Sequence, residues 1–314
     1  MYNADMNEWI ATVSQRLDAF LASEGRVASR AKAQKMIEAG LVRVNGKKEK
    51  RSSTPVEAGD TVKVTGELPP ELSQIEPRDL GLTILYEDEA CMVLDKPAGV
   101  AVHPGAGMEP DEVTMLSGIA YLFKKRSLPF SEASVLVHRL DKETTGCLLI
   151  AKNEDAHRML QKQFETRTVE KKYLALVAGV PEHESAKVDS PIGRSQHDRT
   201  KMSVRGVGRM REAQTTYRVL AEGNGVSLLE CDLHTGRTHQ VRVHLHAIGH
   251  PVLGDPSYST PASIKTSSGI SGLCLHAWKL SFESPATGKR QHTEAAIPSL
   301  ITNQMKKAGI AWSA

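Results

Sequence analysis

The chain has 314 residues, 40% of them hydrophobic and 25% charged, which is typical of a globular protein long enough for two domains with separate cores. No apolar run approaches the roughly 20 residues that span a bilayer, and the first residues lack a signal-peptide core, so we expect no membrane association. The net charge is only +3, and the four cysteines show no Cys-x-x-Cys spacing, which favours a cytoplasmic protein without a zinc site or disulfide framework.

The first predicted elements are two helices. Residues 7–23 place Ile10, Val13 and Leu17 at helical spacing, which predicts a helix that Glu24-Gly25 ends. Ser29 is a suitable N-cap for a second helix over residues 30–39, which Gly40 ends.

A basic hairpin follows the second helix. Residues 41–44 predict a strand, Asn45-Gly46 is the preferred two-residue hairpin turn, and a return strand starts at Lys47. A further strand is predicted at residues 61–64. Nine lysines or arginines and two glutamates between positions 26 and 51 give this block a net charge of +7, so the remainder of the chain sums to −4. Such a block indicates a module that binds a polyanion, the alternative being a solvated charged helix face.

Residues 14–65 resemble the small RNA-binding domain first described in ribosomal small-subunit protein four. The resemblance runs from Gln15-Arg16-Leu17-Asp18 through Val42-Arg43-Val44-Asn45-Gly46 to Asp60-Thr61-Val62. It implies that the basic helix and hairpin lie along the phosphates of an RNA, an arrangement that gives salt-sensitive affinity without base readout. The RNA contacts it implies are Arg30, Lys32, Lys35, Arg43, Lys47 and Lys48. We expect this domain to span residues 1–66 and a proline-containing linker to span residues 67–79.

Residues 80–314 form the predicted second domain, of the α+β class. Its strand patterns are more frequent than its helix patterns, which predicts a mixed, largely antiparallel central sheet with flanking helices. The predicted helices are residues 113–124 and the segment from Asn153 to Phe164, which places Ala156, Met159 and Leu160 on one side. The predicted strands are residues 84–86, 91–94, 135–137, 147–151, 169–177, 214–220, 226–233, 239–245 and 273–282.

Three stretches are candidates for chemistry. The loop His138-Arg139-Leu140-Asp141 to Gly146 lies between two apolar runs, and Asp141 is its one candidate nucleophile or base; alternatively, Asp141 only closes a turn by pairing with Arg139 or Lys142. The histidine-rich stretch 234–250 contains His244-x-His246, which on a strand would present both rings to one face as a metal pair. The third candidate is a serine or cysteine triad, but the sequence contains no Gly-x-Ser-x-Gly elbow to support it.

Four sequence blocks, in order, resemble the RluA-type family of RNA pseudouridine synthases. The blocks are residues 86–104 with Asp95-Lys96-Pro97-Ala98-Gly99, the loop 138–146, Lys171-Lys172-Tyr173, and residues 235–244 followed by Gly254-Asp255-Pro256-Ser257-Tyr258. The family isomerises uridine in RNA to pseudouridine. Because nothing is added or removed overall, the resemblance implies no redox cofactor, metal or nucleotide, and the sequence has no P-loop and no Gly-x-Gly-x-x-Gly.

The resemblance also implies roles for particular residues. Asp141 takes the place of the essential aspartate, Arg242 of the arginine that pairs with it, and Tyr173 of the tyrosine that stacks on the target base and is placed to take its C5 proton. Because a base inside a helix must be extruded before its glycosidic bond is accessible, the resemblance implies base flipping, with the gap filled by Arg139. Further RNA contacts are expected at Lys96, Arg237 and His239.

The sequence therefore predicts a monomeric RNA pseudouridine synthase that acts on large-subunit ribosomal RNA. A tRNA substrate remains an alternative within the same activity. Two alternatives lie in other classes: a non-catalytic RNA-binding or ribosome-assembly factor on the same fold, and a metal-dependent hydrolase that uses the histidine-rich stretch.

Overall fold

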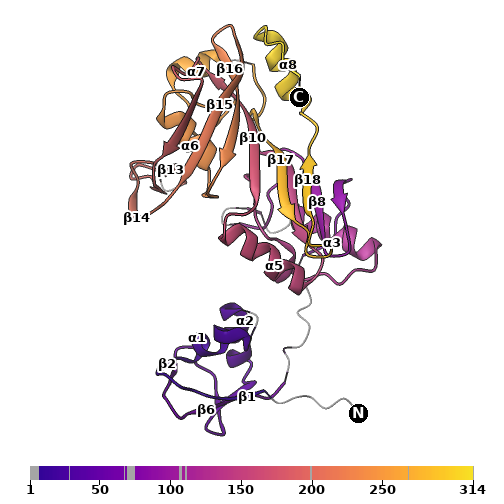
Figure 1. Ribbon diagram of the computed structural model, residues 1–314, viewed down its shortest axis with the longest axis vertical. Coiled ribbons are helices and arrows are strands. Elements are labelled where there is room, and N and C mark those ends of the chain that lie inside the picture. The colour runs from indigo at the N-terminus through magenta and orange to yellow at the C-terminus, as the bar shows by residue number, and fades with distance from the viewer. Residues whose placement is uncertain are drawn as a thin grey trace. The chain divides into compact units, whose positions relative to one another are not determined.

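The structure is a computed structural model that describes residues 7–27, 29–66, 68, 75–105, 108–109, 112–198, 200–267 and 269–313. The chain forms two compact units, Met1–Ser73 and Gln74–Ala314 (Figure 1). Most of the predicted linker, residues 67 and 69–74, lies outside the described residues, and the domain limits predicted from the sequence stay predictions. In the part of the chain that the structure describes, no helix is long and apolar enough to cross a membrane.

The smaller unit is built from two short sheets and two helices. Its larger sheet has the strand order β1-β6-β3-β4, with every pair antiparallel, and β2 pairs with β5. The elements are β1 (Glu8–Ile10), β2 (Gln15–Arg16), α1 (Leu17–Ala22), the 3₁₀ turn η1 (Ser23–Gly25), α2 (Arg30–Glu38), β3 (Val42–Val44), β4 (Lys47–Glu49), β5 (Pro55–Val56) and β6 (Thr61–Val64).

The helix predicted over residues 7–23 is wrong in its first half. Ile10 and Val13 are 66% and 57% exposed, so they contribute nothing to an apolar helix face, and residues 8–10 instead pair with β6. Leu17 and Leu21 are fully buried, and the helix is confined to α1 around them. The apolar spacing was therefore informative only where the residues are buried.

The second helix and the hairpin are confirmed. The Ser29 side chain accepts a hydrogen bond from the backbone N–H of Lys32 at 3.1 Å, which caps α2. Asn45 and Gly46 both have positive φ, 50° and 80°, as the two central residues of a tight type I′ hairpin turn require. The turn presents Lys47 on the exposed strand β4.

The larger unit contains, among the described residues, a nine-stranded sheet. Its order is β11-β15-β16-β10-β17-β9-β8-β7, with β18 also paired to β17. Its strands are β7 (Thr83–Glu87), β8 (Cys91–Lys96), β9 (Thr145–Ala151), β10 (Glu170–Ala178), β11 (Ser185–Asp189), β15 (Gln214–Gly223), β16 (Val226–Leu233), β17 (Leu275–Glu283) and β18 (Arg290–Glu294). A separate small sheet contains β12 (Ile192–Arg194), β13 (Met202–Ser203) and β14 (Val207–Arg211). The helices are α3 (Met115–Lys125), α4 (Glu132–Val135), α5 (Glu154–Glu165), α6 (Gln240–Ala247), α7 (Pro261–Thr266) and α8 (Ser299–Lys307).

The pairing in this sheet confirms the predicted α+β class. Every adjacent pair is antiparallel except β17 with β9, which run parallel, and Figure 1 shows β10, β17 and β18 side by side. The centre of the sheet is covered on both faces. Leu94 and Leu148 contribute to the core that contains α3, whereas their neighbours Val93 and Leu149 contribute to the core that contains α5.

Three predictions in this unit are wrong. Residues 135–137 do not form a strand: α4 ends at Val135, and only Leu136 makes a single bridge to Ile150. Met159 is 48% exposed and does not belong to the buried side of α5. Residues 239–245 are not a strand, because residues 240–247 form the helix α6.

The helix α6 was mistaken for a strand because its residues alternate between apolar and polar. Gln240–Leu245 are all buried, so no exposed face reveals a helical period. The polar members have internal partners instead: His244 donates from Nε2 to the carbonyl of Ser190 and has its Nδ1 at 2.9 Å from the hydroxyl of Thr215. On a helix, His244 and His246 also point in different directions, so the geometric basis for a metal pair is lost.

One buried carboxylate organises the cations of the smaller unit. Asp18, whose side chain is fully buried, accepts hydrogen bonds from Arg16 at 3.0 Å, Arg30 at 3.1 Å and Gln34 at 2.9 Å. The hydrogen bonds from Arg16, with those from Gln34 and Arg30, hold the pKa of Asp18 well below its ordinary value. Asp18 therefore joins α1 to α2 and fixes the direction of two arginines.

We predict that Asp18→Asn lowers the free energy of unfolding of the smaller unit by about 1–3 kcal/mol at neutral pH, because a buried charged acceptor is lost. Because the folded-state pKa of Asp18 is lowered, its stabilisation is present above the ordinary carboxylate pKa and disappears as the pH falls through the folded value. Hydrogen exchange of peptides covering α1 and α2 measures the difference, which should shrink in acid. Glu57→Gln, a change at an exposed site, is the control and should leave the exchange unaltered.

Candidate active site

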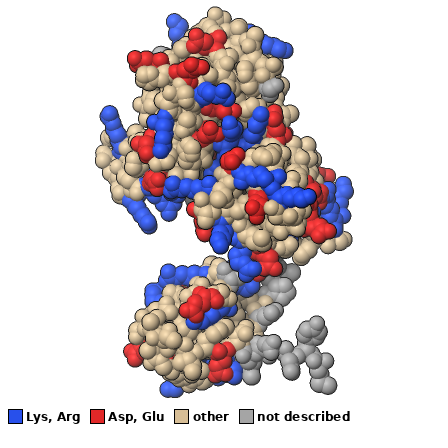
Figure 2. All heavy atoms as spheres, in the orientation of Figure 1, with Lys and Arg blue, Asp and Glu red and all other residues tan. Residues whose placement is uncertain are grey.

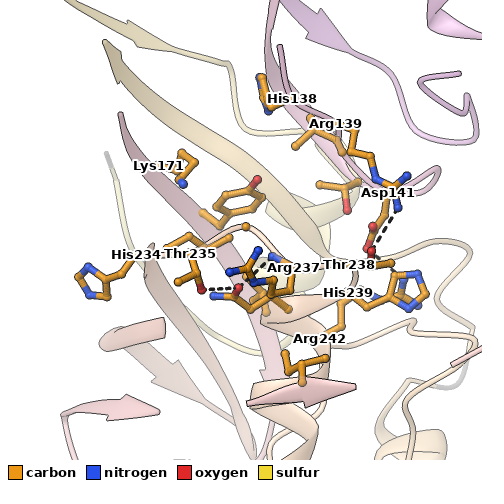
Figure 3. A pocket seen from close by; sticks show the side chains of 18 of the residues that line it. His138, Arg139, Asp141, Lys171, His234, Thr235, Arg237, Thr238, His239 and Arg242 are labelled. Carbon is orange, nitrogen blue, oxygen red and sulfur yellow. Dashed lines mark hydrogen bonds and ion pairs between the residues drawn. The ribbon is translucent and has the colours of Figure 1, made fainter. Parts of the chain in front are cut away.

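A cavity of about 680 Å³ in the larger unit brings together residues from distant parts of the chain. Its wall combines the loop before β9, the strand β10, the loop before α6 and α6 itself. Figure 3 shows the side chains from these elements around it. Six residues predicted from the sequence line it: Asp141, Tyr173, Arg242, Arg139, Arg237 and His239.

The loop that carries Asp141 is anchored at several points. Leu140 is buried in the main core, and the carbonyl of Asp141 accepts the N–H of Thr144 at 3.1 Å, which closes a turn. The buried ammonium of Lys96 donates to the carbonyls of Lys142 at 2.8 Å and Pro97 at 2.7 Å. Asp141 is thereby held between the buried side chain of Leu140 and the turn that Lys96 tethers.

The two ends of this loop are fixed by different means. At its start, Nε2 of His138 accepts the N–H of Leu149, and burial lowers the pKa of His138 to about 3, so the ring is a neutral structural acceptor. At its end, Gly146 has φ +105° and faces the carbonyl of Ala277 so closely that an added Cβ would lie 2.3 Å from the oxygen. Only glycine fits this junction between β9 and β17.

Asp141 is paired with Arg242 across the cavity. Nη1 of Arg242 donates to Oδ2 of Asp141 at 3.1 Å, over a sequence separation of 101 residues. The side chain of Asp141 is 22% exposed and that of Arg242 is 6% exposed, so the carboxylate faces the cavity while its partner is buried. Lys142 pairs instead with Glu112 at 2.7 Å, and Arg139 bonds to His103 and Thr238, so the expected alternative pairing of Asp141 with Arg139 or Lys142 is not found.

Arg242 is held from its other side by Asp255. The guanidinium donates from Nε and Nη2 to the two oxygens of Asp255, both at 2.8 Å, and lies 5.1 Å above the ring of Tyr258. Burial opposes the charged form, but the hydrogen bonds and charge of Asp255, with the charge of Asp141, raise the pKa of Arg242 above its already high ordinary value. The guanidinium is therefore a permanent positive charge at a fixed position.

Tyr173 is a buried residue of β10 that belongs to the main core and also lines the cavity. Burial, together with the charge of Asp141, raises the pKa of its hydroxyl. The side chain is consequently a neutral phenol at physiological pH, which suits an aromatic stacking surface.

Arg139 lies at the exposed rim of the cavity. Its guanidinium contacts Nε2 of His103 at 3.1 Å and donates to the hydroxyl of Thr238 at 3.2 Å. Arg139 thus links the loop that carries Asp141 to the loop before α6. Because neither partner is a carboxylate and the arginine is exposed, its charge stays accessible to an RNA.

One wall of the cavity is rich in cations. Arg167, Lys171, Arg211 and Arg237 line it, and Figure 2 shows lysine and arginine side chains gathered across one face of the larger unit. Arg167 is paired with Glu212, and burial, followed by the charges of Arg211 and Arg167, lowers the pKa of Arg237. Such a wall suits phosphate groups.

Other predicted residues are placed differently. Lys96 is fully buried and bonded to backbone carbonyls, so it presents no charge to an RNA, and the prediction that it contacts RNA is corrected. Its role is to tether the loop of Asp141. The cations predicted to contact RNA from the smaller unit, Arg30, Lys32, Lys35, Arg43, Lys47 and Lys48, lie on α2, β3 and β4, and their RNA contacts stay predictions. Among the described residues, no group of three or more histidine, cysteine or acidic side chains could hold a metal ion.

Sequence reasoning gave no role to Asp255, Tyr258 or Gln240. Gln240 starts α6 by accepting from the N–H of Arg237 at 3.0 Å and from Thr235 at 2.7 Å. Asp255 follows a glycine and precedes a proline, a pattern that reads as a turn and conceals its bond to Arg242. Only the three-dimensional pairing identifies these residues.

Comparisons with known proteins identify the family of the chain. The profile of the RNA pseudouridylate synthase family matches residues 90–247, and that of the S4 domain matches residues 15–62. The chain is 39% identical to "Uncharacterized RNA pseudouridine synthase YlyB" of Bacillus subtilis, with 91% of each chain covered. It is 36% identical to "Ribosomal large subunit pseudouridine synthase D" of Zymomonas mobilis, again over 91% of each. The solved structure of human RNA pseudouridylate synthase domain containing 4 superimposes with a TM-score of 0.60 at 27% identity, covering 74% of this chain and 94% of that one.

The chain therefore belongs to the RNA pseudouridine synthase family, and it carries an N-terminal S4 domain. It is an RNA pseudouridine synthase, an isomerase that acts on uridine in RNA. The resemblance read from the four sequence blocks is confirmed.

The tether from Lys96 generates a prediction for Lys96→Met. Burial lowers the pKa of Lys96 to about 8 from 10.5, so the unfolded chain binds more protons between these values and wild-type stability rises with pH there. Relative to Lys96→Met, the free energy of unfolding of the wild type should therefore grow by about 1 kcal/mol per pH unit from pH 8 to pH 10. Denaturant unfolding of both proteins across this range measures it.

Two further outcomes bear on the same tether. Lys96→Met should speed hydrogen exchange in the loop 138–144, since the carbonyl of Lys142 loses its donor. A stability difference that stays constant with pH, with unchanged exchange in the loop, would show that Lys96 does not tether it.

Proposed function

We propose that the enzyme isomerises specific uridines of large-subunit ribosomal RNA, with Asp141 as the catalytic residue. The observation that carries this proposal is the Asp141 carboxylate, which faces a cavity large enough for a nucleotide while a buried arginine holds it from one side. A carboxylate paired with a permanent cation remains ionised and aimed. That is the state required of a group that attacks the sugar or the base, or removes the 2′ proton.

The reaction needs a broken C1′–N1 bond, a rotated uracil and a new C5–C1′ bond. The C5 proton leaves in the last step and N1 gains one, so atoms and electrons balance without a cofactor. In the proposal Tyr173 stacks on the uracil and lies on the path of the C5 proton. The raised pKa of its hydroxyl supports stacking and hydrogen bonding over a pre-formed phenolate base.

A uridine in a helix must leave the stack to enter this cavity. Arg139, at the rim, is the proposed occupant of the gap left behind, since it is exposed and bonds to the side chains of His103 and Thr238. The cations Arg237 and Lys171, which line the cavity, are proposed contacts for the flanking phosphates, and His239 is a proposed contact for the nucleotide itself. These assignments follow from placement around Asp141.

Two observations support ribosomal RNA of the large subunit over tRNA. Relatives that are 36–39% identical are named ribosomal large subunit pseudouridine synthase D. The S4 domain supplies a second basic surface, which suits a large structured RNA because phosphate contacts position a protein without reading sequence. The cytoplasmic location and monomeric state predicted from the sequence stay predictions.

We predict that Asp141→Asn abolishes release of tritium from 5-tritiated RNA while RNA binding is retained. The amide keeps the shape of the side chain but removes the charge that the reaction requires. The measurement is tritium released from large-subunit ribosomal RNA transcripts and, in parallel, from tRNA transcripts. Asp155→Asn, at an exposed position of α5, is the matched control and should react like the wild type.

Several outcomes of this assay would contradict the proposal. Equal release by the wild type and Asp141→Asn would remove Asp141 from the chemistry. Release from tRNA alone would overturn the substrate, and activity that a chelator abolishes would favour the metal-dependent alternative.

The S4 domain generates a separate prediction. Arg43 and Lys47 are exposed on the basic hairpin, and replacing both by alanine should reduce the slope of log affinity against log salt by about 1–2, since up to two phosphate contacts are lost. Lys63→Ala, a cation on β6 that pairs with Glu8, is the control. Filter binding of ribosomal RNA at several salt concentrations measures the slope, and an unchanged slope in the double variant would rule out a docking role for the hairpin.

A further inference from the structure

Two carboxylates share the three hydrogen-bonding nitrogens of Arg242. Nε and Nη2 are used by Asp255, both at 2.8 Å, so one full edge of the planar guanidinium faces that residue. Nη1 alone reaches Asp141, at 3.1 Å. The bidentate bond therefore goes to the carboxylate outside the cavity wall, and the single bond goes to the one that faces the substrate.

Asp255 is fixed independently of the arginine. Its side chain is fully buried, and Oδ1 also accepts the backbone N–H groups of Ser257 at 2.8 Å and Tyr258 at 3.0 Å. The ring of Tyr258 lies against the guanidinium, and its hydroxyl is bonded to Nδ1 of His239 at 2.7 Å. Asp255 and Tyr258, from the turn after α6, thus hold the guanidinium of Arg242 in place.

The planar shape of the guanidinium determines how Arg242 can bond to the two carboxylates. An arginine that faces one carboxylate prefers the two-bond arrangement, which engages both oxygens. Released from Asp255, Arg242 could turn an edge toward Asp141 and occupy both of its oxygens. Held as it is, Arg242 bonds to Oδ2 of Asp141 and leaves Oδ1 unengaged by the guanidinium.

We propose that Asp255 is a positioning residue that keeps Arg242 end-on to Asp141, so that the catalytic carboxylate stays ionised yet retains one oxygen for the reaction. The inference rests on the proposed role of Asp141. Asp255 touches no substrate in this account, because it acts through the guanidinium that it holds.

The pH behaviour of Asp141 reports this arrangement. The titratable and charged groups that interact with it are Arg242 from α6, His239 from the loop before it, Tyr258, Tyr173 from β10 and Lys96 from β8. Asp255, from the turn after α6, is bonded to the other edge of Arg242. Removing the charge of Asp255 leaves that of Arg242 uncompensated and frees the fork to close on Asp141. Both changes favour the ionised carboxylate, so the titration of Asp141 should move to lower pH.

The test is an NMR titration of the full-length protein labelled with ¹³C at the aspartate carboxyl carbons, with the Asp141 signal assigned by its loss in Asp141→Asn. Asp255→Asn should move the titration of Asp141 to lower pH, because a nearby negative charge is removed. In an Arg242→Gln background the same change should have less than half this effect, since only the direct field of Asp255 remains. Equal effects in the two backgrounds, or none in either, would overturn the inference.

The kinetic expectation separates positioning from folding. Asp255→Asn should lower kcat about 100-fold with KM changed less than threefold, and its acidic limb should lie at lower pH than that of the wild type. If Asp255→Asn only reduced the amount of folded enzyme, kcat would fall while the acidic limb of its pH profile stayed in place. That result would contradict the inference. The NMR readout does not require turnover, so a wild type without tritium release would refute the proposed function and leave this titration decisive.

A second variant covers the case in which Asp255→Asn does not fold. Arg242→Lys places a compact ammonium beside two carboxylates, and it lacks the planar fork needed to bridge them. With Asp255 retaining the ammonium, Asp141 loses its cation and should titrate at higher pH than in the wild type. An unchanged midpoint in Arg242→Lys would show that bridging by the guanidinium is not what sets the state of Asp141.

Discussion

The ion pair between Arg242 and Asp141 links two walls of the cavity in the larger unit. It joins a loop before β9 to a helix 101 residues later, and it lies where four separate elements meet around one cavity. A guanidinium buried to this extent carries a large desolvation cost, which is offset only if its hydrogen bonds are satisfied and the geometry is good. Asp255 supplies that satisfaction with two bonds of 2.8 Å. The surrounding fold is therefore the framework that holds the charges of Asp141, Arg242 and Asp255 at fixed positions.

That framework explains features that otherwise look costly. The first six residues of α6 are buried, and its polar residues Gln240 and His244 are stabilised by bonds to β15 and to the adjoining loops. Lys96 is buried so that its ammonium can tether the turn beside Asp141. Gly146 allows β9 and β17 to meet directly behind that turn. Lys96 and Gly146 therefore act on the loop of Asp141, whereas Gln240 and His244 hold α6, which carries Arg242.

Much of this could be predicted from the sequence, for identifiable reasons. The hairpin at Asn45-Gly46 and the cap at Ser29 follow from local chemistry, which one segment carries by itself. The central strands were predicted because they are apolar and buried on both faces. The helix α6 was not, because burial on all sides removes the period that distinguishes a helix from a strand. Asp255 was not assigned a role because its partner lies on another element, and a turn motif in sequence says nothing of what the carboxylate bonds to.

The catalytic role of Asp141 in ribosomal RNA modification can be tested by mapping pseudouridines in large-subunit ribosomal RNA from cells that carry either the wild-type protein or Asp141→Asn at the same level. Particular uridines should be modified in the first strain and unmodified in the second, with the tRNA map unchanged. Identical ribosomal RNA maps in the two strains would contradict this role.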